Sequence, residues 1–303
     1  MPIAPIAFVG GFLKRNVDRG RLSELLSRGE PLLAPGAYDC LSARLVEQAG
    51  FEAVYMTGFG ASASLLGLPD IGLLSFGEML DQARRMVQAV GIPVIADADS
   101  GYGNAINVIR TVREYETVGV AAIQLEDQLA PKRCGHLEGK RVIAEDEMVG
   151  KIRAAVEART SKDCLIIART DARSIEGLDR ALARARRYHE AGADVLFVDA
   201  PQSEDEVAAI AEALPDVPRL YNWLEGGKSP PLSRERLKEL GFRIVIFPLS
   251  ALTMAIRVVR DGLVQLRAEG TPKPITDRPV RLHEVLDVVG FPEIRALGER
   301  FSK

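Results

Sequence analysis

The sequence predicts an α/β protein of the (β/α)8 barrel class, and three observations support this prediction. Eight short apolar segments alternate with segments of helical periodicity along the 303 residues. Several helix-to-strand junctions share a small residue followed by glycine, as in Ala49-Gly50 and Ala191-Gly192. Eight such units over roughly 240 residues match the size of this barrel. The alternative, an open doubly wound sheet, would have a glycine-rich nucleotide turn after its first strand, and Pro35-Gly36-Ala37-Tyr38 lacks that pattern.

The predicted strands are apolar runs of the kind that parallel sheets bury on both faces. Each one ends where a polar residue, a glycine or a proline follows. In chain order, the predicted strands cover residues 32–34, 53–56, 93–96, 121–125, 165–168, 195–198, 219–221 and 244–247.

The predicted helices lie between these strands and have recognisable start and stop signals. Asp39 is typical of an N-cap, Ser75 and Glu78 form a capping-box pattern, and Gly50 and Gly119 are typical helix ends. In chain order, the predicted helices cover residues 14–28, 40–48, 75–90, 104–118, 144–159, 177–191, 203–213, 233–240 and 250–269. The small residues 57–62 and the polar residues 128–142 are predicted to form loops.

The chain is expected to contain one catalytic barrel domain, residues 1–270, and a C-terminal tail, residues 271–303. The tail begins with Pro272, Pro274 and Pro279, and an amphipathic helix over residues 282–289 follows. A segment beyond the eighth unit cannot enter a closed barrel. We therefore expect the tail to pack on the outside of the barrel or on a partner subunit.

Composition favours a cytoplasmic enzyme that acts on a small molecule. The formal net charge of −3 favours neither nucleic acid nor an anionic membrane as a partner. The three cysteines, an odd number at wide spacing, do not resemble a disulfide framework. The apolar N-terminus lacks the pattern of a signal peptide, and no apolar run is long enough to cross a bilayer.

Polar residues follow most of the predicted strands. In a barrel of this class, the carboxyl ends of all strands face one opening, where active sites are built. The residues at these ends are Thr57, Asp97, Asp99, Glu126, Asp127, Arg169, Asp171, Asp199 and Asn222. The plain alternative is that polarity simply resumes wherever a strand ends.

Asp97 and Asp99 follow the strand at residues 93–96, and Gly101 and Gly103 come directly after them. Residues two apart in a strand point to the same face, so the two carboxylates are expected to project together. With Glu126, they form a set of hard oxygen ligands that suits Mg²⁺ or Mn²⁺ better than Zn²⁺. The alternative is a solvated acidic turn.

Arg169 and Cys134 are the other candidates for chemistry. The planar fork of Arg169 suits a substrate carboxylate, although an ion pair with Asp171 or Glu126 is an alternative. Cys134 lies in a polar loop beside cationic side chains, which lower a thiol pKa and suit it to proton transfer. An incidental loop cysteine is the alternative.

Three motifs give the chain a resemblance to a known superfamily. The run Lys132-Arg-Cys-Gly-His-Leu137 resembles the signature hexapeptide of isocitrate lyases and 2-methylisocitrate lyases. The run from Asp97 to Gly103 and the triplet Glu126-Asp127-Gln128 are similar to motifs of the isocitrate lyase/phosphoenolpyruvate mutase superfamily. The resemblance extends over about residues 22–260.

The resemblance implies a barrel whose eighth helix is exchanged between subunits, in a homotetramer built as a dimer of dimers. It implies Mg²⁺ at Asp99, with Asp97, Glu126 and Asp70 holding its waters. Arg169, Cys134 and His136 would be catalytic, with Cys134 protonating an enolate. The oxo-acid part of the substrate would be bound by residues that include Tyr55, Thr57, Gly58, Gly135, Arg169, Asp199 and Asn222.

Two departures from the 2-methylisocitrate lyase pattern affect the expected substrate. Asp199 stands where those enzymes usually have glutamate, and Phe59 replaces a glycine. The segment from Asn222 to Pro230 instead resembles the branch that contains 2,3-dimethylmalate lyase and carboxyphosphonoenolpyruvate mutase. The resemblance therefore argues against isocitrate itself as the substrate.

The leading hypothesis is a Mg²⁺-dependent carbon–carbon lyase for a substituted malate, such as 2-methylisocitrate or 2,3-dimethylmalate, with pyruvate as the oxo-acid product. The second hypothesis is decarboxylation or hydrolysis of oxaloacetate in the same site. Decarboxylation needs only a stabilised enolate and would not need Cys134. Carboxyphosphonoenolpyruvate mutase is a third hypothesis, and a barrel that binds an oxo-acid without catalysis is a fourth.

Overall fold

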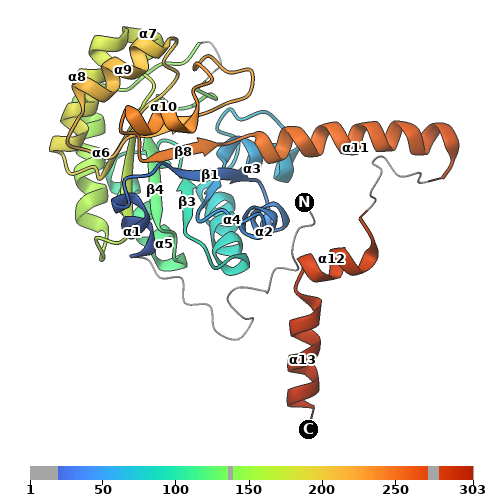
Figure 1. Cartoon of the computed structure of the whole chain (residues 1–303). Helices are drawn as coiled ribbons and strands as arrows, with labels where there is room; N and C mark the ends of the chain where they lie inside the picture. Colours follow the sequence, from blue (N-terminus) through green and yellow to red (C-terminus); the bar gives the residue numbers. More distant parts are fainter. Residues whose placement is uncertain (1–19, 136–138, 272–279, 303) are drawn as a thin grey trace.

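The computed structural model describes residues 20–135, 139–271 and 280–302. Eight parallel strands form a nearly closed barrel in the order β6-β5-β4-β3-β2-β1-β8-β7, surrounded by helices (Figure 1). A backbone bridge between Leu196 and Arg219 links the two ends of this order. The strands are β1 Leu32–Ala37, β2 Val54–Met56, β3 Val94–Asp97, β4 Ala122–Glu126, β5 Leu165–Thr170, β6 Val195–Val198, β7 Leu220–Asn222 and β8 Ile244–Phe247. The predicted fold class is confirmed.

Two separate cores stabilise this arrangement. One fills the barrel interior and includes Tyr55, Ile95, Ile167 and Phe197, and the other lies between the strands and the surrounding helices. The helices are α1 Arg21–Ser27, α2 Cys40–Gln48, α3 Gly58–Leu66, α4 Phe76–Ala89, α5 Ala105–Val118, α6 Glu145–Ala158, α7 Arg173–Glu176, α8 Leu178–Glu190, α9 Glu204–Ala213, α10 Arg234–Glu239, α11 Ser250–Glu269, α12 Leu282–Val288 and α13 Phe291–Phe301.

Helix α1 closes the amino-terminal end of the barrel. Leu22, Leu25 and Leu26 on this helix are buried in the same cluster as Leu32 and Ile244, which begin β1 and β8. The predicted helix over residues 14–28 is described from Arg21 to Ser27, and its residues 14–19 lie outside the described part of the chain. With one end closed by leucines, the carboxyl ends of the strands remain as the place for a site.

The prediction of a loop over residues 57–62 is wrong, because this segment begins helix α3. The Thr57 hydroxyl accepts a hydrogen bond from the Gly60 amide at 3.1 Å and caps the helix. A Cβ on Gly60 would lie 2.8 Å from Cβ of Tyr38, so a small residue is needed for this close approach. Capping and tertiary packing outweigh the low helix propensity of the glycines.

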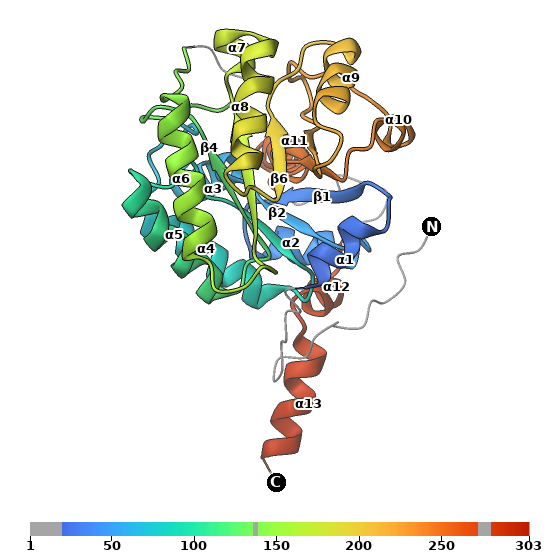
Figure 2. The ribbon, with the colours of Figure 1, turned by 90° about the vertical axis from the view of Figure 1, so that its left-hand side faces the viewer.

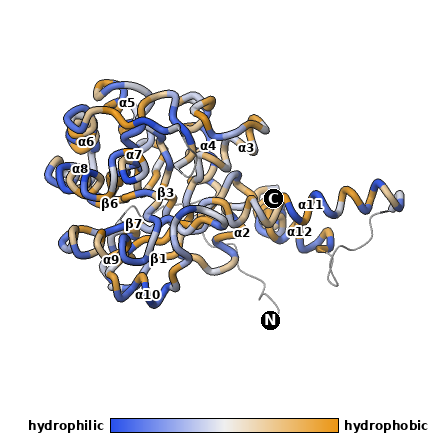
Figure 3. The backbone as a smooth tube through the Cα atoms, turned by 90° about the horizontal axis from the view of Figure 1, so that it is seen from above, coloured by the Kyte–Doolittle hydropathy of each residue, from blue (hydrophilic) through white to orange (hydrophobic). Residues whose placement is uncertain are grey.

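Helix α11 extends away from the barrel, and α12 and α13 follow it outside (Figures 1 and 2). Only Leu252 of α11 is buried, and hydrophobic and hydrophilic residues alternate along its length (Figure 3). The carbonyl of Val288 at the end of α12 accepts hydrogen bonds from Arg44 (3.1 Å) and Gln48 (3.4 Å) of α2. Helix α13 was not predicted. None of the helices in the described ranges is both long and apolar enough to span a bilayer.

Candidate active site

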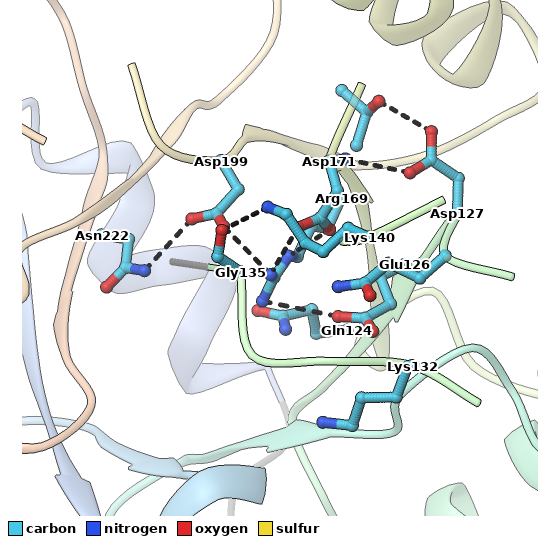
Figure 4. Close-up of polar contacts among 12 residues, drawn as sticks. Gln124, Glu126, Asp127, Lys132, Gly135, Lys140, Arg169, Asp171, Asp199 and Asn222 are labelled. Atoms are coloured by element: carbon cyan, nitrogen blue, oxygen red, sulfur yellow. Dashed lines mark hydrogen bonds and ion pairs between the residues drawn. The ribbon is translucent and has the colours of Figure 1, made fainter. Parts of the chain in front are cut away.

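Five of the nine predicted strand-end residues line one pocket at the carboxyl end of the barrel: Thr57, Asp97, Glu126, Arg169 and Asn222. Its polar lining includes Asp70, Asp97, Glu126, Lys132, Arg169 and Asn222, and its apolar lining includes Phe59, Leu224, Ile246, Pro248 and Leu249. Figure 4 shows the central polar contacts, which join side chains from β4, β5 and β7 with Asp199, the residue after β6. The barrel thus brings the polar ends of five strands, β2, β3, β4, β5 and β7, to one opening.

Asp97 and Asp99 lie together, but not for the reason that the sequence suggested. Asp97 is the last residue of β3, and Asp99 has a positive φ of 47°, so strand alternation does not set its direction. The Asp99 amide instead donates to Oδ1 of Asp97 at 3.1 Å. A Cβ on Gly58 would lie 2.6 Å from Asp97 and 3.5 Å from Asp99, so both carboxylates face Gly58.

Lys132 is a site residue that sequence reasoning treated only as a neighbour of Cys134. Its Nζ lies 2.6 Å from Oδ1 of Asp70 and 2.6 Å from Oδ1 of Asp99. Burial alone would lower the pKa of Lys132, but the carboxylates around it outweigh this effect and raise its pKa well above the usual value. Burial raises the pKa of Asp99 to about 6, against the attraction of Lys132. A protonated lysine thus lies among the predicted metal ligands.

Glu126 ends β4 and is 1% exposed. Burial raises the pKa of Glu126 well above its usual value, although Arg169 and Lys132 act in the opposite direction. Its Oε2 lies 3.4 Å from Nη1 of Arg169, while its Oε1 has no hydrogen-bond partner among the described atoms. A buried carboxylate oxygen of this kind is suited to accept a hydrogen bond from a ligand or a metal-bound water.

Arg169 is surrounded by three carboxylates, so both ion-pair partners considered from the sequence are present. Its Nε and Nη2 each donate to Asp171 at 2.9 Å, and Nη2 also donates to Asp199 at 3.0 Å. Burial would raise the pKa of Asp171, but Arg169 and Lys140 hold it well below the usual range. The guanidinium also lies over the ring of Phe197, 5.2 Å from its centroid. Arg169 is therefore fixed in orientation before any substrate arrives.

Asp199, Asn222 and Gly135 form one edge of the site. The amide of Asn222 donates to Oδ1 of Asp199 at 3.2 Å. A Cβ on Gly135 would lie 1.8 Å from Asp199 Oδ2 and 2.3 Å from Arg169 Nη2. Only glycine can therefore bring its backbone this close to the Arg169–Asp199 pair.

Cys134 lines the pocket, and its amide donates to the carbonyl of Asp70 at 3.2 Å. The Gln128 side chain accepts from the Arg133 amide at 2.9 Å and donates to the Arg133 carbonyl at 2.8 Å. These backbone contacts fix the strand-end loop that carries the thiol. The predicted catalytic residue His136 lies outside the described residues.

Of the predicted oxo-acid residues between β2 and α3, Tyr55 and Thr57 line the pocket, and Gly58 contacts Asp97 beside it. The Tyr55 hydroxyl donates to Gln124 at 3.3 Å, and Gln124 donates to Asp97 at 3.4 Å. Burial raises the pKa of Tyr55 well above its usual value, so it stays a neutral donor. Thr57 lines the pocket while it caps α3, and the Gly58 amide donates to Asp97 at 3.3 Å. Gln124 was missed, although a polar residue inside an apolar strand is a recognisable signal.

Behind the site, Asp127 accepts three hydrogen bonds. Their donors are the Thr170 hydroxyl (2.7 Å), the Asp171 amide (2.9 Å) and the Tyr188 hydroxyl (2.8 Å). Burial raises the pKa of Asp127 to about 6. This network fixes the backbone of Asp171, which in turn holds Arg169.

The donor set fits a hard divalent cation, but only with waters completing its coordination. Asp70, Asp97 and Glu126 line the pocket, Asp99 lies beside Asp97 and Lys132, and one oxygen of Glu126 lacks a hydrogen-bond partner among the described atoms. Among the described residues, no three His, Cys, Asp or Glu side chains are arranged as a complete ligand set. Mg²⁺ usually keeps several waters and needs one or two direct carboxylates, so this arrangement is compatible with it.

Comparisons with known proteins agree with this geometry. The family model described as phosphoenolpyruvate phosphomutase matches residues 22–267. The chain is 46% identical over 282 residues to 2,3-dimethylmalate lyase of Eubacterium barkeri, with coverage of 93% of this chain and 97% of that one. It is 43% identical over 270 residues to 2-methylisocitrate lyase of Aeropyrum pernix, with coverage of 89% and 86%.

Solved structures of similar proteins share the fold over nearly the whole chain. Oxaloacetate acetylhydrolase in complex with 3,3-difluorooxaloacetate superposes with a TM-score of 0.89 and 40% identity, over 97% of this chain and 98% of that one. Phosphonopyruvate hydrolase in complex with oxalate and Mg²⁺ superposes with a TM-score of 0.85 and 32% identity, over 94% and 99%.

Proposed function

Because this chain belongs to the phosphoenolpyruvate phosphomutase family, we propose that it is a carbon–carbon lyase for a substituted malate-type 2-hydroxy acid. Substrates of the 2,3-dimethylmalate or 2-methylisocitrate type fit this proposal, with an oxo-acid such as pyruvate as one product. The observation that supports it best is that Arg169, the carboxylate cluster and Cys134 line one pocket.

In this reaction the bond between C2 and C3 of the substrate breaks. The 2-hydroxyl loses its proton and becomes the carbonyl of the oxo-acid, and the electron pair of the broken bond forms an enolate on the leaving half. The Cys134 thiol protonates the enolate carbon and becomes a thiolate. The proton released by the 2-hydroxyl passes to solvent, and the thiolate takes one proton back from solvent, so no proton is gained or lost overall. Arg169 binds the carboxylate of the oxo-acid half, with Nη1 as the nitrogen least used by protein partners.

The other residues orient the substrate and hold charge. Asp99 would hold Mg²⁺, or Mn²⁺, and Asp97, Glu126 and Asp70 would hold its waters. When bound, the metal stabilises negative charge that develops on the substrate oxygens. Asp199 and Asn222 lie on the side of Arg169 next to Gly135 and would contact the substrate there. The apolar wall with Phe59 and Leu224 is suited to an alkyl substituent.

Oxaloacetate cleavage, by hydrolysis or decarboxylation, is the second candidate. The observation that favours it is the similarity to oxaloacetate acetylhydrolase over nearly the whole chain. A carboxyphosphonoenolpyruvate mutase is favoured less, because the Cys134-Gly135 sequence resembles the lyases. A barrel that only binds an oxo-acid would give no turnover of any of these compounds.

A panel assay tests these proposals. The purified protein with Mg²⁺ is incubated with 2,3-dimethylmalate, 2-methylisocitrate, oxaloacetate and isocitrate, and the release of pyruvate or oxalate is measured. We expect turnover of a substituted malate and none of isocitrate. In the Cys134→Ser variant, lyase turnover should collapse while decarboxylation of oxaloacetate should largely survive. A lack of release from every compound would rule out the lyase and the oxaloacetate reactions together.

The assembly that we propose is a homotetramer in which α11 packs on a partner subunit. Exposed apolar side chains along α11 support it: Met254, Ile256, Val258, Val259, Leu263, Val264 and Leu266. The tail helices α12 and α13 would complete the same contact. Light scattering of the purified chain measures the oligomeric mass. We also propose a cytoplasmic location, which the odd number and wide spacing of the three cysteines support.

A further inference from the structure

Lys140 is a buried lysine that the proposed reaction does not use. Its Nζ donates to Oδ1 of Asp171 at 2.9 Å and to the carbonyl of Gly135 (Figure 4). Its side chain is 2% exposed. We propose that Lys140 is a positioning residue that fixes the Arg169 fork and the backbone beside Cys134 through a single ammonium group. This inference rests on the proposed function only in assuming that the pocket binds a carboxylate.

Lys140 changes the balance of charge around Arg169. Arg169 faces the carboxylates of Asp171, Asp199 and Glu126 in a buried environment. A bound substrate carboxylate would be a fourth negative group around one guanidinium. Lys140 supplies a second positive charge at Asp171, where buried ionic contacts are strong. Arg169 can then attract an incoming carboxylate instead of only balancing Asp171.

Lys140 also holds the backbone next to the Cys134 thiol. Gly135 lies so close to Asp199 and Arg169 that even a Cβ would overlap both side chains. The Lys140 ammonium donates to the Gly135 carbonyl and holds this peptide against the ion pair. Cys134 immediately precedes it, so the same contact limits where the thiol can lie. In the proposed reaction, Arg169 and Cys134 act on the two halves of the substrate. The Lys140 ammonium contacts the neighbours of both residues, so it fixes their positions relative to each other.

The chemistry of lysine suits this role. An ammonium group has three donors and can bond a carboxylate and a carbonyl in different directions, while its long stem crosses the buried space. Methionine has a similar length but no donor and no charge. Lys140→Met therefore removes both contacts with little change in volume.

Oxalate binding tests the part that involves Arg169. Titration calorimetry with oxalate at saturating Mg²⁺ compares the wild-type chain with Lys140→Met. Loss of a charge-assisted contact predicts binding weaker by about tenfold or more. This measurement does not need turnover, so it tests Lys140 even if the substrate proposal fails. Unchanged oxalate affinity in a folded Lys140→Met variant would overturn the role at Arg169.

Alkylation of Cys134 tests the part that involves Gly135. Iodoacetamide labelling is followed by peptide mass spectrometry, which separates Cys134 from Cys40 and Cys164. We expect a changed alkylation rate at Cys134 in Lys140→Met and unchanged rates at the other two cysteines. An unchanged rate at Cys134 would overturn the backbone role.

A double-mutant cycle tests whether Lys140 acts through Asp171. In the Asp171→Asn background, Lys140 has no carboxylate to neutralise. The further effect of Lys140→Met on oxalate affinity should then fall below about threefold, since contacting residues are not additive. An equal effect in both backgrounds contradicts the mechanism.

Arg159→Met is the matched control for loss of a partly buried cation. Arg159 donates to Asp194 and to the carbonyl of Cys164 near the start of β5, at the opposite end of the barrel. Arg159→Met should lower the free energy of unfolding, while oxalate affinity and the alkylation rate of Cys134 stay unchanged.

Lys140→Gln is the second variant, for use if Lys140→Met does not fold. It keeps a hydrogen-bond donor without the charge, and it should still weaken oxalate binding. Normal oxalate affinity in Lys140→Gln would equally overturn the charge argument.

Discussion

The Lys132 ammonium lies 2.6 Å from Oδ1 of Asp99, and both side chains are buried. The same nitrogen lies 2.6 Å from Asp70. Lys132 thus links two carboxylates that the sequence suggested only as metal ligands. Since a buried carboxylate is stable as an anion only when a cation is close, Lys132 is expected to contribute to folding as well as to the site.

Lys132→Met should lower the free energy of unfolding by about 3–5 kcal/mol, because it leaves buried carboxylates without a cation. Urea unfolding in metal-free buffer measures this change. Lys238→Met is the control, since Lys238 makes an exposed ion pair with Glu30 and should change stability little. Equal losses in the two variants would contradict the structural role of Lys132.

Gly135→Ala should abolish turnover, because its Cβ would lie 1.8 Å from Asp199 and 2.3 Å from Arg169. The backbone or the ion pair must move, and either movement displaces Arg169. Gly150→Ala is the matched control, since its Cβ would meet nothing within 4 Å inside helix α6. That change should leave turnover intact and stabilise the helix by about 0.5–1 kcal/mol. Assays and thermal unfolding of both variants test this contrast.

Arg169→Lys should raise KM by ~10- to 100-fold, because one ammonium cannot reproduce the double contact with Asp171 while also reaching Asp199. Steady-state kinetics on the substrate identified in the panel assay measure the effect. Arg173→Lys, which alters the ion pair with Glu206 on α9, should leave KM near the wild-type value. A normal KM in Arg169→Lys would show that the fork does not bind the substrate carboxylate.

Removal of metal with EDTA should abolish turnover, and added Mg²⁺ or Mn²⁺ should restore it. The carboxylates around Asp99 are hard oxygen donors, which favour these ions. Asp99→Asn should need a higher Mg²⁺ concentration for half-maximal turnover. Full activity after exhaustive chelation would contradict metal dependence.

Tyr188→Phe should lower the free energy of unfolding by about 1–2 kcal/mol, since it removes the hydrogen bond to Asp127 and the one that Tyr188 accepts from Arg184. Asp127 keeps its contacts with Thr170 and the Asp171 amide, so Arg169 should stay oriented and KM should change little. Urea unfolding and kinetics measure both quantities. A large rise in KM would show that Tyr188 positions Arg169 through this network.

Local patterns in the sequence determined the barrel and most of the pocket lining. Strand alternation, helix caps and polar strand ends are short-range signals, so Asp97, Glu126, Arg169 and Asn222 could be assigned to one opening without a structure. Helix α3 could not be predicted from the sequence. Its small residues favour a loop, but the close approach of Gly60 to Tyr38 and the cap at Thr57 stabilise a helix.

The tertiary structure alone decided where Asp99 points and which carboxylates Lys132 and Lys140 contact. Asp99 faces the site because its backbone has a positive φ, and no strand alternation predicts that direction. Lys132 reaches Asp70, and Lys140 reaches Asp171, across 62 and 31 positions of the chain. Sequence patterns report what neighbouring residues favour, whereas ion pairing depends on distances between residues that only the closed barrel brings together.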